Sequence, residues 1–283
     1  MVKNIWIFGL LLAIVLTTLE SQAQYGAIST ATAGSGRATI EPSESPFLNP
    51  AAIAYNRGYF VTSDYGVMQG ASEFSVGLSD NLPDTLVPAA FMYNQVNGTD
   101  PTSNQQFTTQ DLHLDISNLV RRDFAAGLSI RSKSDLLFQT QYRQTNVMFG
   151  SIWVLTPNIG VALVLDNLLK PDATVPEPFR LTPSAAVGIN YNYKKVIRFR
   201  FDVETASNDS LNGTSFAAGI EGHWNQWSVF RMGVRKDLET NTDEYGAGIG
   251  FSGPKFAFHY GYLMSPEQQA LNRQAVDLAV PIW

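Results

Sequence analysis

The chain has 283 residues, no cysteine and a net charge of −6, and only 16% of its residues are charged. Without cysteine it can form neither a disulfide framework nor a thiolate metal site. The mild acidity and the lack of a Lys/Arg cluster argue against a nucleic-acid partner.

The amino-terminal residues 1–23 have the layout of a secretory signal peptide. A lysine precedes an almost wholly apolar run at 5–16, and the small residues Ser21 and Ala23 stand before a cleavage site at Gln24. That run is too short to cross a bilayer comfortably, and no later apolar stretch reaches the length of about 18 residues that a transmembrane helix needs. The protein is therefore expected to be exported, and to be either soluble or a β-barrel.

Residues 24–56 differ in composition from the rest of the chain. They are rich in Ala, Ser, Thr, Gly and Pro, so long regular elements are not expected there. Within 47–54, Asn49 is predicted to cap a short helix that has Pro50 at its first position. We interpret 24–56 as an arm or plug inside a lumen, which Asn49 and Pro50 anchor rather than contacting a substrate.

Residues 57–283 contain about fourteen strand-like segments and no helical periodicity. Turn-forming residues such as Asn, Asp, Gly and Pro separate the segments. An even number of strands lets an antiparallel sheet close without edges, which a bilayer demands. The segments fall at roughly 58–68, 73–78, 86–96, 111–120, 124–131, 140–155, 159–165, 184–193, 196–205, 215–224, 228–236, 244–252, 256–263 and 274–282.

The segment 196–205 shows most clearly how these strands are built. Four apolar residues at odd positions alternate with the charged residues Arg198, Arg200, Asp202 and Glu204. A period of two predicts a strand with two different faces. Other segments repeat the rule, and their non-apolar face is rich in Gly and poor in Lys, which suits a crowded lumen better than open solvent. The predicted fold class is all-β, a transmembrane antiparallel barrel with a luminal arm. A soluble β-sandwich or barrel is the alternative.

The charged ladder is the candidate site. Its side chains are expected to point inward from three neighbouring strands, and they are Arg198, Arg200, Asp202, Glu204, Glu221, Arg231 and Arg235. One interpretation is that they brace the lumen and fix the plug through cross-strand charge pairs. The other is a constriction that selects a permeating solute by charge. Both can hold together.

No catalytic motif is present. His113, His223 and His259 lie on the polar faces of separate strands, a pattern more typical of lumen residues than of metal ligands. The chain contains neither a nucleophile elbow nor a zinc-binding HExxH motif nor a phosphate loop. We expect no enzyme, no metal and no cofactor.

Short motifs resemble those of a known group of outer-membrane proteins. They are Ala-Gly-Ser-Gly-Arg-Ala at 33–38, Asn-Pro-Ala-Ala at 49–52, a Gly-containing strand ending in Asn-Leu at 158–168, and Arg-Met-Gly-Val-Arg at 231–235. Together they resemble the long-chain fatty-acid transporter (FadL/TodX-like) superfamily, which includes PorV-like barrels. The resemblance implies an outer-membrane barrel whose amino-terminal arm folds into the lumen, and a route for hydrophobic substrates.

The expected function is passage of small, hydrophobic compounds across the bacterial outer membrane, with Gly-rich inner faces leaving room for them. The alternative is a non-transporting scaffold for a secretion or envelope complex, as the PorV-like resemblance implies. The expected partners are outer-membrane lipid, hydrophobic small molecules and, for the alternative, secretion or envelope proteins. An apolar pocket beneath the arm would favour the transporter. A filled lumen with exposed apolar loops would favour the scaffold.

Overall fold

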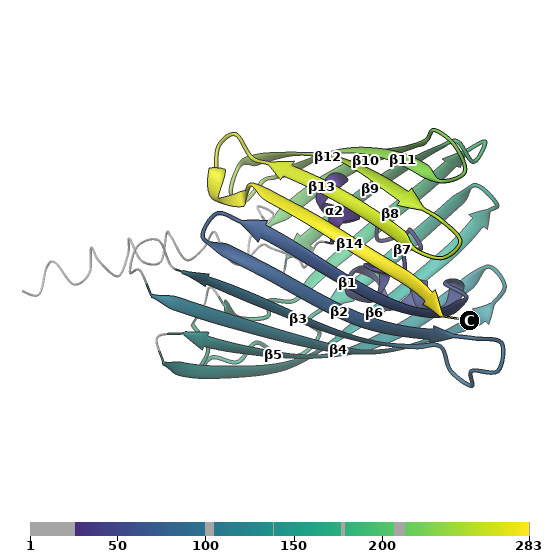
Figure 1. Ribbon diagram of the computed structural model, residues 1–283. Helices are drawn as coiled ribbons and strands as arrows, with labels where there is room; N and C mark the ends of the chain where they lie inside the picture. Colours follow the sequence, from purple (N-terminus) through teal and green to yellow (C-terminus); the bar gives the residue numbers. More distant parts are fainter. Residues whose placement is uncertain (1–25, 100–104, 138, 177–178, 207–212, 283) are drawn as a thin grey trace, which may run out of the picture.

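The protein is a closed antiparallel barrel of fourteen strands, seen here in a computed structural model that describes residues 26–282 apart from 100–104, 138, 177–178 and 207–212. The expected signal peptide lies outside the described residues. Each strand pairs with its neighbours in sequence, and β1 pairs with β14 to close the sheet (Figure 1). The strands are β1 Gly58–Met68, β2 Ala71–Asn81, β3 Ala89–Thr99, β4 Gln106–Arg121, β5 Phe124–Leu137, β6 Thr140–Thr156, β7 Ile159–Asp166, β8 Ser184–Tyr193, β9 Ile197–Ala206, β10 Thr214–His223, β11 Ser228–Asp237, β12 Thr242–Ser252, β13 Ala257–Met264 and β14 Arg273–Ile282.

The period-two alternation places apolar and charged residues on opposite faces of the wall. On β9, Phe199 and Phe201 are 44% and 43% exposed on the outer surface, whereas Arg200 and Asp202 are each 2% exposed inside. All fourteen predicted strands are present, several of them longer than their sequence pattern. The all-β barrel is therefore confirmed, and the soluble β-sandwich is excluded by closure of the sheet.

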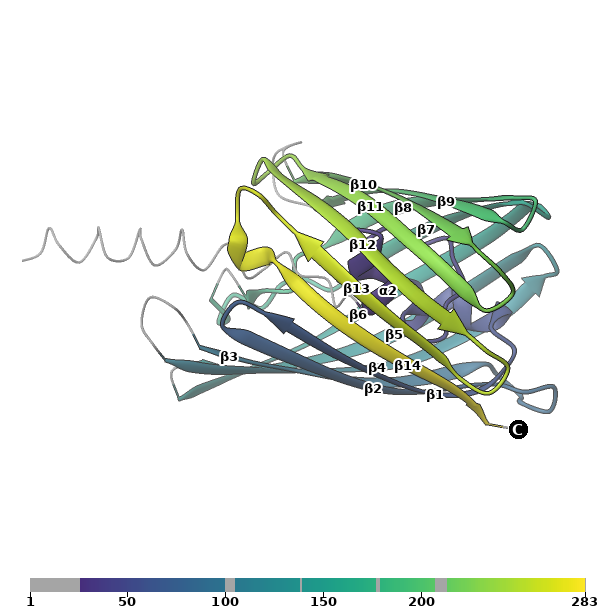
Figure 2. The ribbon, with the colours of Figure 1, turned by 45° about the horizontal axis from the view of Figure 1, so that its top comes forward.

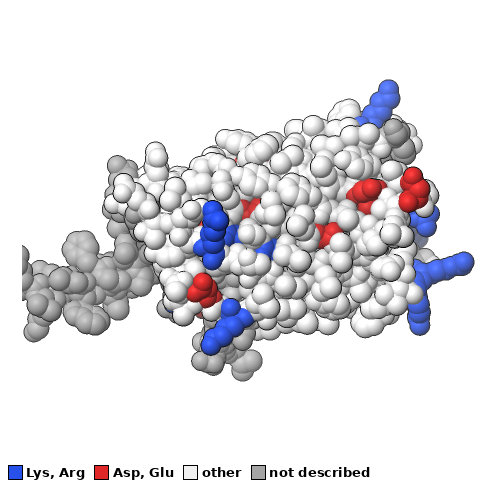
Figure 3. Space-filling view, turned by 90° about the horizontal axis from the view of Figure 1, so that it is seen from below, with Lys and Arg blue, Asp and Glu red and all other residues white. Residues whose placement is uncertain are grey.

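The outer wall suits a hydrocarbon environment. Large apolar side chains such as Phe230, Met232 and Ile249 are more than half exposed on it. On the face shown in Figure 3, most of the visible Lys, Arg, Asp and Glu side chains lie toward the two ends of the barrel. No helix in the described part of the chain is both long and apolar enough to cross a membrane.

The two ends of the barrel differ in their connections. One end, here called the turn end, holds the C-terminus and short connections, of which 82–88 is the longest (Figure 2). The other, the loop end, holds the longest connection of the chain, 167–183, and a 3₁₀ helix, η4, at Gln269–Leu271. Short turns face the periplasm and longer loops the cell exterior in bacterial outer-membrane barrels.

The described part of the arm, residues 26–56, lies inside the barrel. It forms helix α2 (Ala27–Ala31), helix α3 (Ser45–Leu48) and the 3₁₀ helix η2 (Pro50–Tyr55). Helix α2 packs against β12–β14, and η2 packs against β4–β6 on the other side. The helix expected after Asn49 is present as the 3₁₀ helix η2, and the extended backbone of Asn49 (φ −164°) separates it from α3, which was not expected.

The arm lies directly on inward-facing glycines. At these positions an added Cβ would stand 2.0–2.6 Å from an arm atom, closer than real Cβ atoms come to any neighbour. The glycines are Gly127, Gly150, Gly219, Gly233, Gly246, Gly248 and Gly261. The composition of the Gly-rich inner faces suggested an open path, but the arm occupies the space beside these glycines.

Candidate functional site

The charged ladder faces the lumen as its spacing predicts. Arg198, Arg200, Asp202 and Glu204 lie on β9, Glu221 on β10, and Arg231 and Arg235 on β11. In the register of the sheet, Arg198 pairs with Glu221, and Glu221 pairs with Arg231. The structure therefore gathers all seven residues on one wall, where most of them are buried.

Glu221 is the centre of this wall. Its carboxylate accepts hydrogen bonds from Arg231 Nε at 2.6 Å and from Arg200 Nη2 at 2.9 Å. Arg198 Nη1 and His223 Nε2 lie 3.3 and 3.0 Å from its other oxygen. Three arginines thus surround one wall carboxylate, and a second acid nearby offsets part of the remaining positive charge.

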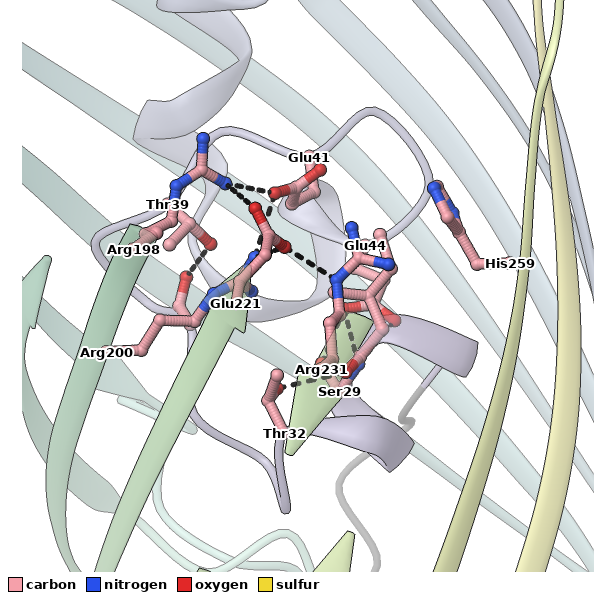
Figure 4. Close-up of polar contacts among 12 residues, drawn as sticks. Ser29, Thr32, Thr39, Glu41, Glu44, Arg198, Arg200, Glu221, Arg231 and His259 are labelled. Atoms are coloured by element: carbon pink, nitrogen blue, oxygen red, sulfur yellow. Dashed lines mark hydrogen bonds and ion pairs between the residues drawn. The ribbon is translucent and has the colours of Figure 1, made fainter. Parts of the chain in front are cut away.

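The arm supplies that second acid. Glu41 Oε1 accepts from Arg198 Nη1 at 2.7 Å and from Arg200 Nη2 at 3.0 Å, and Figure 4 shows it beside Glu221. Burial alone would raise the pKa of Glu41, but Arg198 and Arg200 outweigh it and hold that pKa below its usual value. Glu41 is therefore held as a carboxylate that ties the arm to β9.

A second set of charged contacts ties the arm to β9, and here the arm supplies the base and the strand supplies the acids. Asp202 accepts from the backbone N–H groups of Gly36 (2.7 Å) and Arg37 (3.0 Å), and the Arg37 side chain donates to Glu204 at 2.7 Å. Arg235 donates to Ser215 at 3.2 Å. The wall thus binds arm residues of both charges.

The opposite end of the arm segment is anchored by polar contacts of Asn49. Its side chain donates to the backbone oxygens of Arg37 (2.9 Å) and Ser151 (3.3 Å) and accepts from Ala51 N at 3.0 Å, which caps η2. Pro50 occupies the first position of η2. The predicted cap is confirmed at this position.

Glu44 forms a third contact, within the arm itself. It accepts from Ser29 N at 2.8 and 3.0 Å and from Ser29 Oγ at 2.5 Å, so it fastens α2 to the start of α3. Burial and the nearby Asp277 carboxylate raise the pKa of Glu44 to about 7, against the lowering effect of the Ser29 bonds. Next to it, Ser43 Oγ donates to Asp277 at 3.3 Å.

Sequence reasoning missed several charged residues. Arg37, Glu41 and Glu44 are the only charged residues in 24–56, and this scarcity was a usable signal. Sequence reasoning also missed an ion pair on the far wall, where Arg131 donates to Asp111 from Nε (2.8 Å) and Nη2 (2.5 Å). The alternation around Asp111 is the same as that of 196–205 and could have identified it.

A small cavity lies between the arm and the β4–β9 wall. Its volume is about 60 Å³. Its wall combines apolar residues with polar and charged ones, and the lining residues are Arg37, Phe47, Leu48, His113, Arg131, Met148, Val164, Asp166, Ser184, Ala186 and Glu204. A cavity of about 150 Å³ is known to hold benzene, so this space is too small for one aromatic ring while the arm is in place.

The connection 167–183 folds inward at the loop end. Gln144 on β6 donates to the backbone oxygen of Phe179 (2.8 Å) and accepts from Leu181 N (3.0 Å). Val175 and Phe179 pack with Leu137 in a buried apolar cluster. The lumen is thus narrowed by a second segment besides the arm.

The histidines lie apart, as expected. His113 contacts Phe47 edge to face, and His259 Nδ1 donates to Asp277 at 2.7 Å while its Nε2 lies 3.2 Å from Ser252 Oγ. No group of three or more His, Asp or Glu among the described residues is arranged to hold a metal ion.

The Ser252–His259–Asp277 row has the members of a hydrolytic triad, but the backbone next to the serine is occupied. Ser252 N donates to Trp227 at 2.7 Å and Gly253 N donates to Phe256 at 2.9 Å. These N–H groups are therefore not available as donors to a developing oxyanion.

Comparison with known proteins finds similarity in structure only. No family model matches the sequence, and no curated protein is significantly similar to it. The toluene transporter TodX of Pseudomonas putida has a TM-score of 0.65 at 10% identity, over 93% of this chain and 98% of TodX. This chain has the TodX/FadL-like barrel fold. A FadL homologue of Pseudomonas aeruginosa has a TM-score of 0.60 at 13% identity, over 90% and 97% of the two chains.

A third solved structure is more distant. The outer-membrane protein Omp33 of Acinetobacter baumannii has a TM-score of 0.51 at 7% identity, over 80% of this chain and 98% of its own. The fold that the sequence motifs implied is thus confirmed by the TodX and FadL-like structures, of which TodX is described as a transporter.

Proposed function

We propose that the protein is an outer-membrane barrel through which small hydrophobic compounds pass. Residues 1–23 would be removed as a signal peptide, residues 24–56 would act as a plug, and residues 57–283 would form the barrel. The observation that carries the proposal is that the arm fills the lumen through reversible contacts, hydrogen bonds and ion pairs to β9, rather than as part of the wall.

Similar folds support the type of cargo. TodX is described as a toluene transporter, and a variant of it as a monoaromatic hydrocarbon channel. The exposed apolar outer face supports a place in the membrane, because soluble monomers rarely expose contiguous apolar patches larger than a few hundred Å². Since the cavity of about 60 Å³ cannot hold an aromatic ring, passage through this part of the lumen would require the arm to move.

The ladder residues would serve this function by holding the plug. Asp202 and Glu204 hold Arg37, while Arg198 and Arg200 hold Glu41. Once the arm moves, the same side chains would line the path and act on a passing solute by charge. Asn49 and Pro50 would anchor the end of the arm that adjoins the barrel wall.

Uptake into liposomes tests the proposal. The full-length protein is compared with a variant lacking 24–56, using toluene and the fluorescent apolar dye N-phenyl-1-naphthylamine as solutes. We expect the full-length protein to admit the apolar solutes without conducting ions, and the shortened one to conduct ions. Retarded, unheated migration in SDS gels verifies that both barrels are folded. Absence of uptake and conductance in both folded forms would contradict a channel.

The same proposal assigns no enzymatic function. The Ser252–His259–Asp277 row would brace β12–β14, since its backbone donors are already bonded. A fluorophosphonate probe should therefore leave Ser252 unlabelled.

A scaffold is the second candidate, because the described lumen is largely filled and an apolar connection is exposed at the turn end. Leu86, in the connection 82–88, is 96% exposed. A scaffold would conduct nothing with or without the arm, and Leu86→Ser would weaken its capture of an envelope protein without changing uptake.

A further inference from the structure

Three neighbouring connections at the turn end share an unusual composition. They are 194–196 between β8 and β9, 224–227 between β10 and β11, and 253–256 between β12 and β13. Together they contain three lysines and three aromatic residues and no acidic residue. These are Lys194, Lys195, Lys255, Trp224, Trp227 and Phe256.

The three connections form one continuous edge. His223 N donates to Val196 O at 2.8 Å, which joins the first connection to the second. Ser252 N donates to Trp227 O at 2.7 Å, which joins the second to the third. Trp227 stacks on Phe251 at 6.3 Å between ring centroids, and Phe251 contacts Phe256 at 5.3 Å.

This edge continues the apolar outer wall. Tyr193 and Phe251 are 44% and 38% exposed on that wall, and Trp224 beyond them is 81% exposed. Aromatic residues that follow an apolar band toward its end are typical of the depth of lipid headgroups. The lysines therefore lie where the apolar band ends.

The backbone gives an independent reason to regard the lysines as functional. Lys194 and Lys195 have φ values of +51° and +57°, and Val196 N donates to Tyr193 O at 3.0 Å across this two-residue turn. Such turns strongly favour Asn-Gly, because side chains with a Cβ are disfavoured at positive φ. The chain places two lysines where local structure favours other residues. Strained positions of this kind cluster at functional sites.

The charges are also free to act outward. In the parts of the chain that the structure describes, neither Lys194 nor Lys195 forms a salt bridge with an acidic side chain. Lys194 Nζ lies 5.2 Å from the centre of the Tyr193 ring. An exposed ammonium next to an apolar band is suited to a phosphate, which a lysine binds as a point charge.

We propose that these three connections bind the phosphate groups of anionic phospholipids in the leaflet at the turn end, with Lys194, Lys195 and Lys255 as the cationic contacts and Trp224 and Trp227 at the headgroup depth. Each lysine near an anionic surface adds to the attraction. The inference rests on the proposed place of the barrel in a membrane, but not on the transport of any solute.

The turn itself offers a sharp test. In the double variant Lys194→Asn/Lys195→Gly both charges are removed and the residues that favour this turn are introduced, so the barrel should unfold at the same or a higher temperature. Folded full-length protein is reconstituted into nanodiscs of phosphatidylcholine containing phosphatidylglycerol. The enrichment of phosphatidylglycerol around the barrel is then measured by native mass spectrometry. The matched control is Lys170→Gln, in the connection 167–183 at the opposite end.

We expect the double variant to lose most of the enrichment, several-fold relative to the unchanged protein, and the control to keep it. Lys255→Gln should lower it further, and raised salt should weaken it in the unchanged protein. Equal enrichment in the double variant and the unchanged protein would overturn the proposal. So would an enrichment that an acidic polypeptide abolishes while phosphatidylglycerol vesicles do not compete, because the partner would then be a protein. A barrel without uptake that still enriches phosphatidylglycerol would contradict the proposed function and leave this inference standing.

Discussion

At the scale of single residues, the arm is held by very few charges. Arg37 and Glu41 meet β9 with opposite polarity, and each finds partners of the opposite sign within 3.4 Å. Two of the four partners, Asp202 and Arg200, are fully buried, so removing the residue that pairs with them leaves a charge in a poorly solvated place. Breaking such a buried pair costs more than the pair itself contributes.

Arg37→Met should therefore loosen the arm. The substitution removes the guanidinium through which the arm contacts Asp202 and Glu204. Because Glu204 remains partly exposed, we expect a loss of docking free energy on the order of 3 kcal/mol, at the low end for a broken buried pair. Limited proteolysis of the arm in detergent would measure the change, with Arg122→Met at the exposed turn end as the control.

A double variant separates charge from packing. Arg37→Met/Asp202→Asn removes the base and the buried one of its two acidic partners, so it should recover part of the arm's protection. If the double variant were as sensitive to protease as the sum of its single changes, the ion pair would not be what holds the arm.

The raised pKa of Glu44 predicts that docking of the arm depends on pH. Burial and Asp277 raise its pKa from 4.5 to about 7. Below about pH 4.5 the carboxyl is protonated whether or not the arm is docked, so its stabilising effect is fully present. Between about pH 4.5 and 7 the undocked arm loses the proton first, and docking weakens by about 3 kcal/mol in total. Arm protection should fall over this window, and Glu44→Gln should remove most of the fall.

The measurement compares the two proteins at pH 5 and pH 8. All other titratable groups are the same in both proteins, so only the difference between the proteins reports on Glu44. An identical loss of protection in Glu44→Gln would assign the pH effect to another group.

At the scale of elements, the arm and the strands fit because the strands lack side chains where the arm lies. Small residues on the inner face allow the backbone of α2 to contact β11–β13 directly. Close packing of this kind tolerates no added volume, since overpacking forces neighbouring atoms to shift. The docking site therefore depends on glycines, which leave room for the arm, as much as on the charged ladder.

Gly233→Ala tests this contact. Its Cβ would lie 2.2 Å from the carbonyl carbon of Thr32, which cannot move away without moving α2. We expect arm docking to weaken by about 1–3 kcal/mol while the barrel stays folded. Gly222→Ala is the matched control on the neighbouring strand, since an added Cβ there meets nothing within 4 Å. Equal arm protection in both variants would show that the fit is not tight.

The strands were predictable because their signal is local. Period-two alternation and turn residues recur along the whole barrel, so even the weakest segment, 73–78, was recognised, though the strand β2 is longer. The ladder was predictable for the same reason. Its partners were not, because Glu41 and Arg198 are 157 residues apart in sequence, and nothing local to either residue specifies that contact.

At the scale of the whole molecule, the lumen is narrowed by two independent segments. The arm crosses the lumen from β4–β6 to β9 and β12–β14, and the connection 167–183 folds over the loop end above β6. Two barriers in series mean that removing one exposes the other. The resistance of the barrel to ions therefore depends on both.

Gln144→Ala tests how the two barriers combine. Gln144 holds the connection through a donated hydrogen bond to Phe179 and an accepted one from Leu181, so alanine removes two of its contacts with the barrel wall, while those of Lys133 and Asn146 remain. In planar bilayers, we expect this change to raise the single-channel conductance of the variant lacking 24–56, by roughly twofold if the connection is the remaining constriction. In the full-length protein it should produce no conductance, because the arm still fills the lumen. Gln141→Ala, an exposed position on the same strand, should change neither form. Opening of the full-length barrel by Gln144→Ala alone would mean that the connection, and not the arm, is the main barrier.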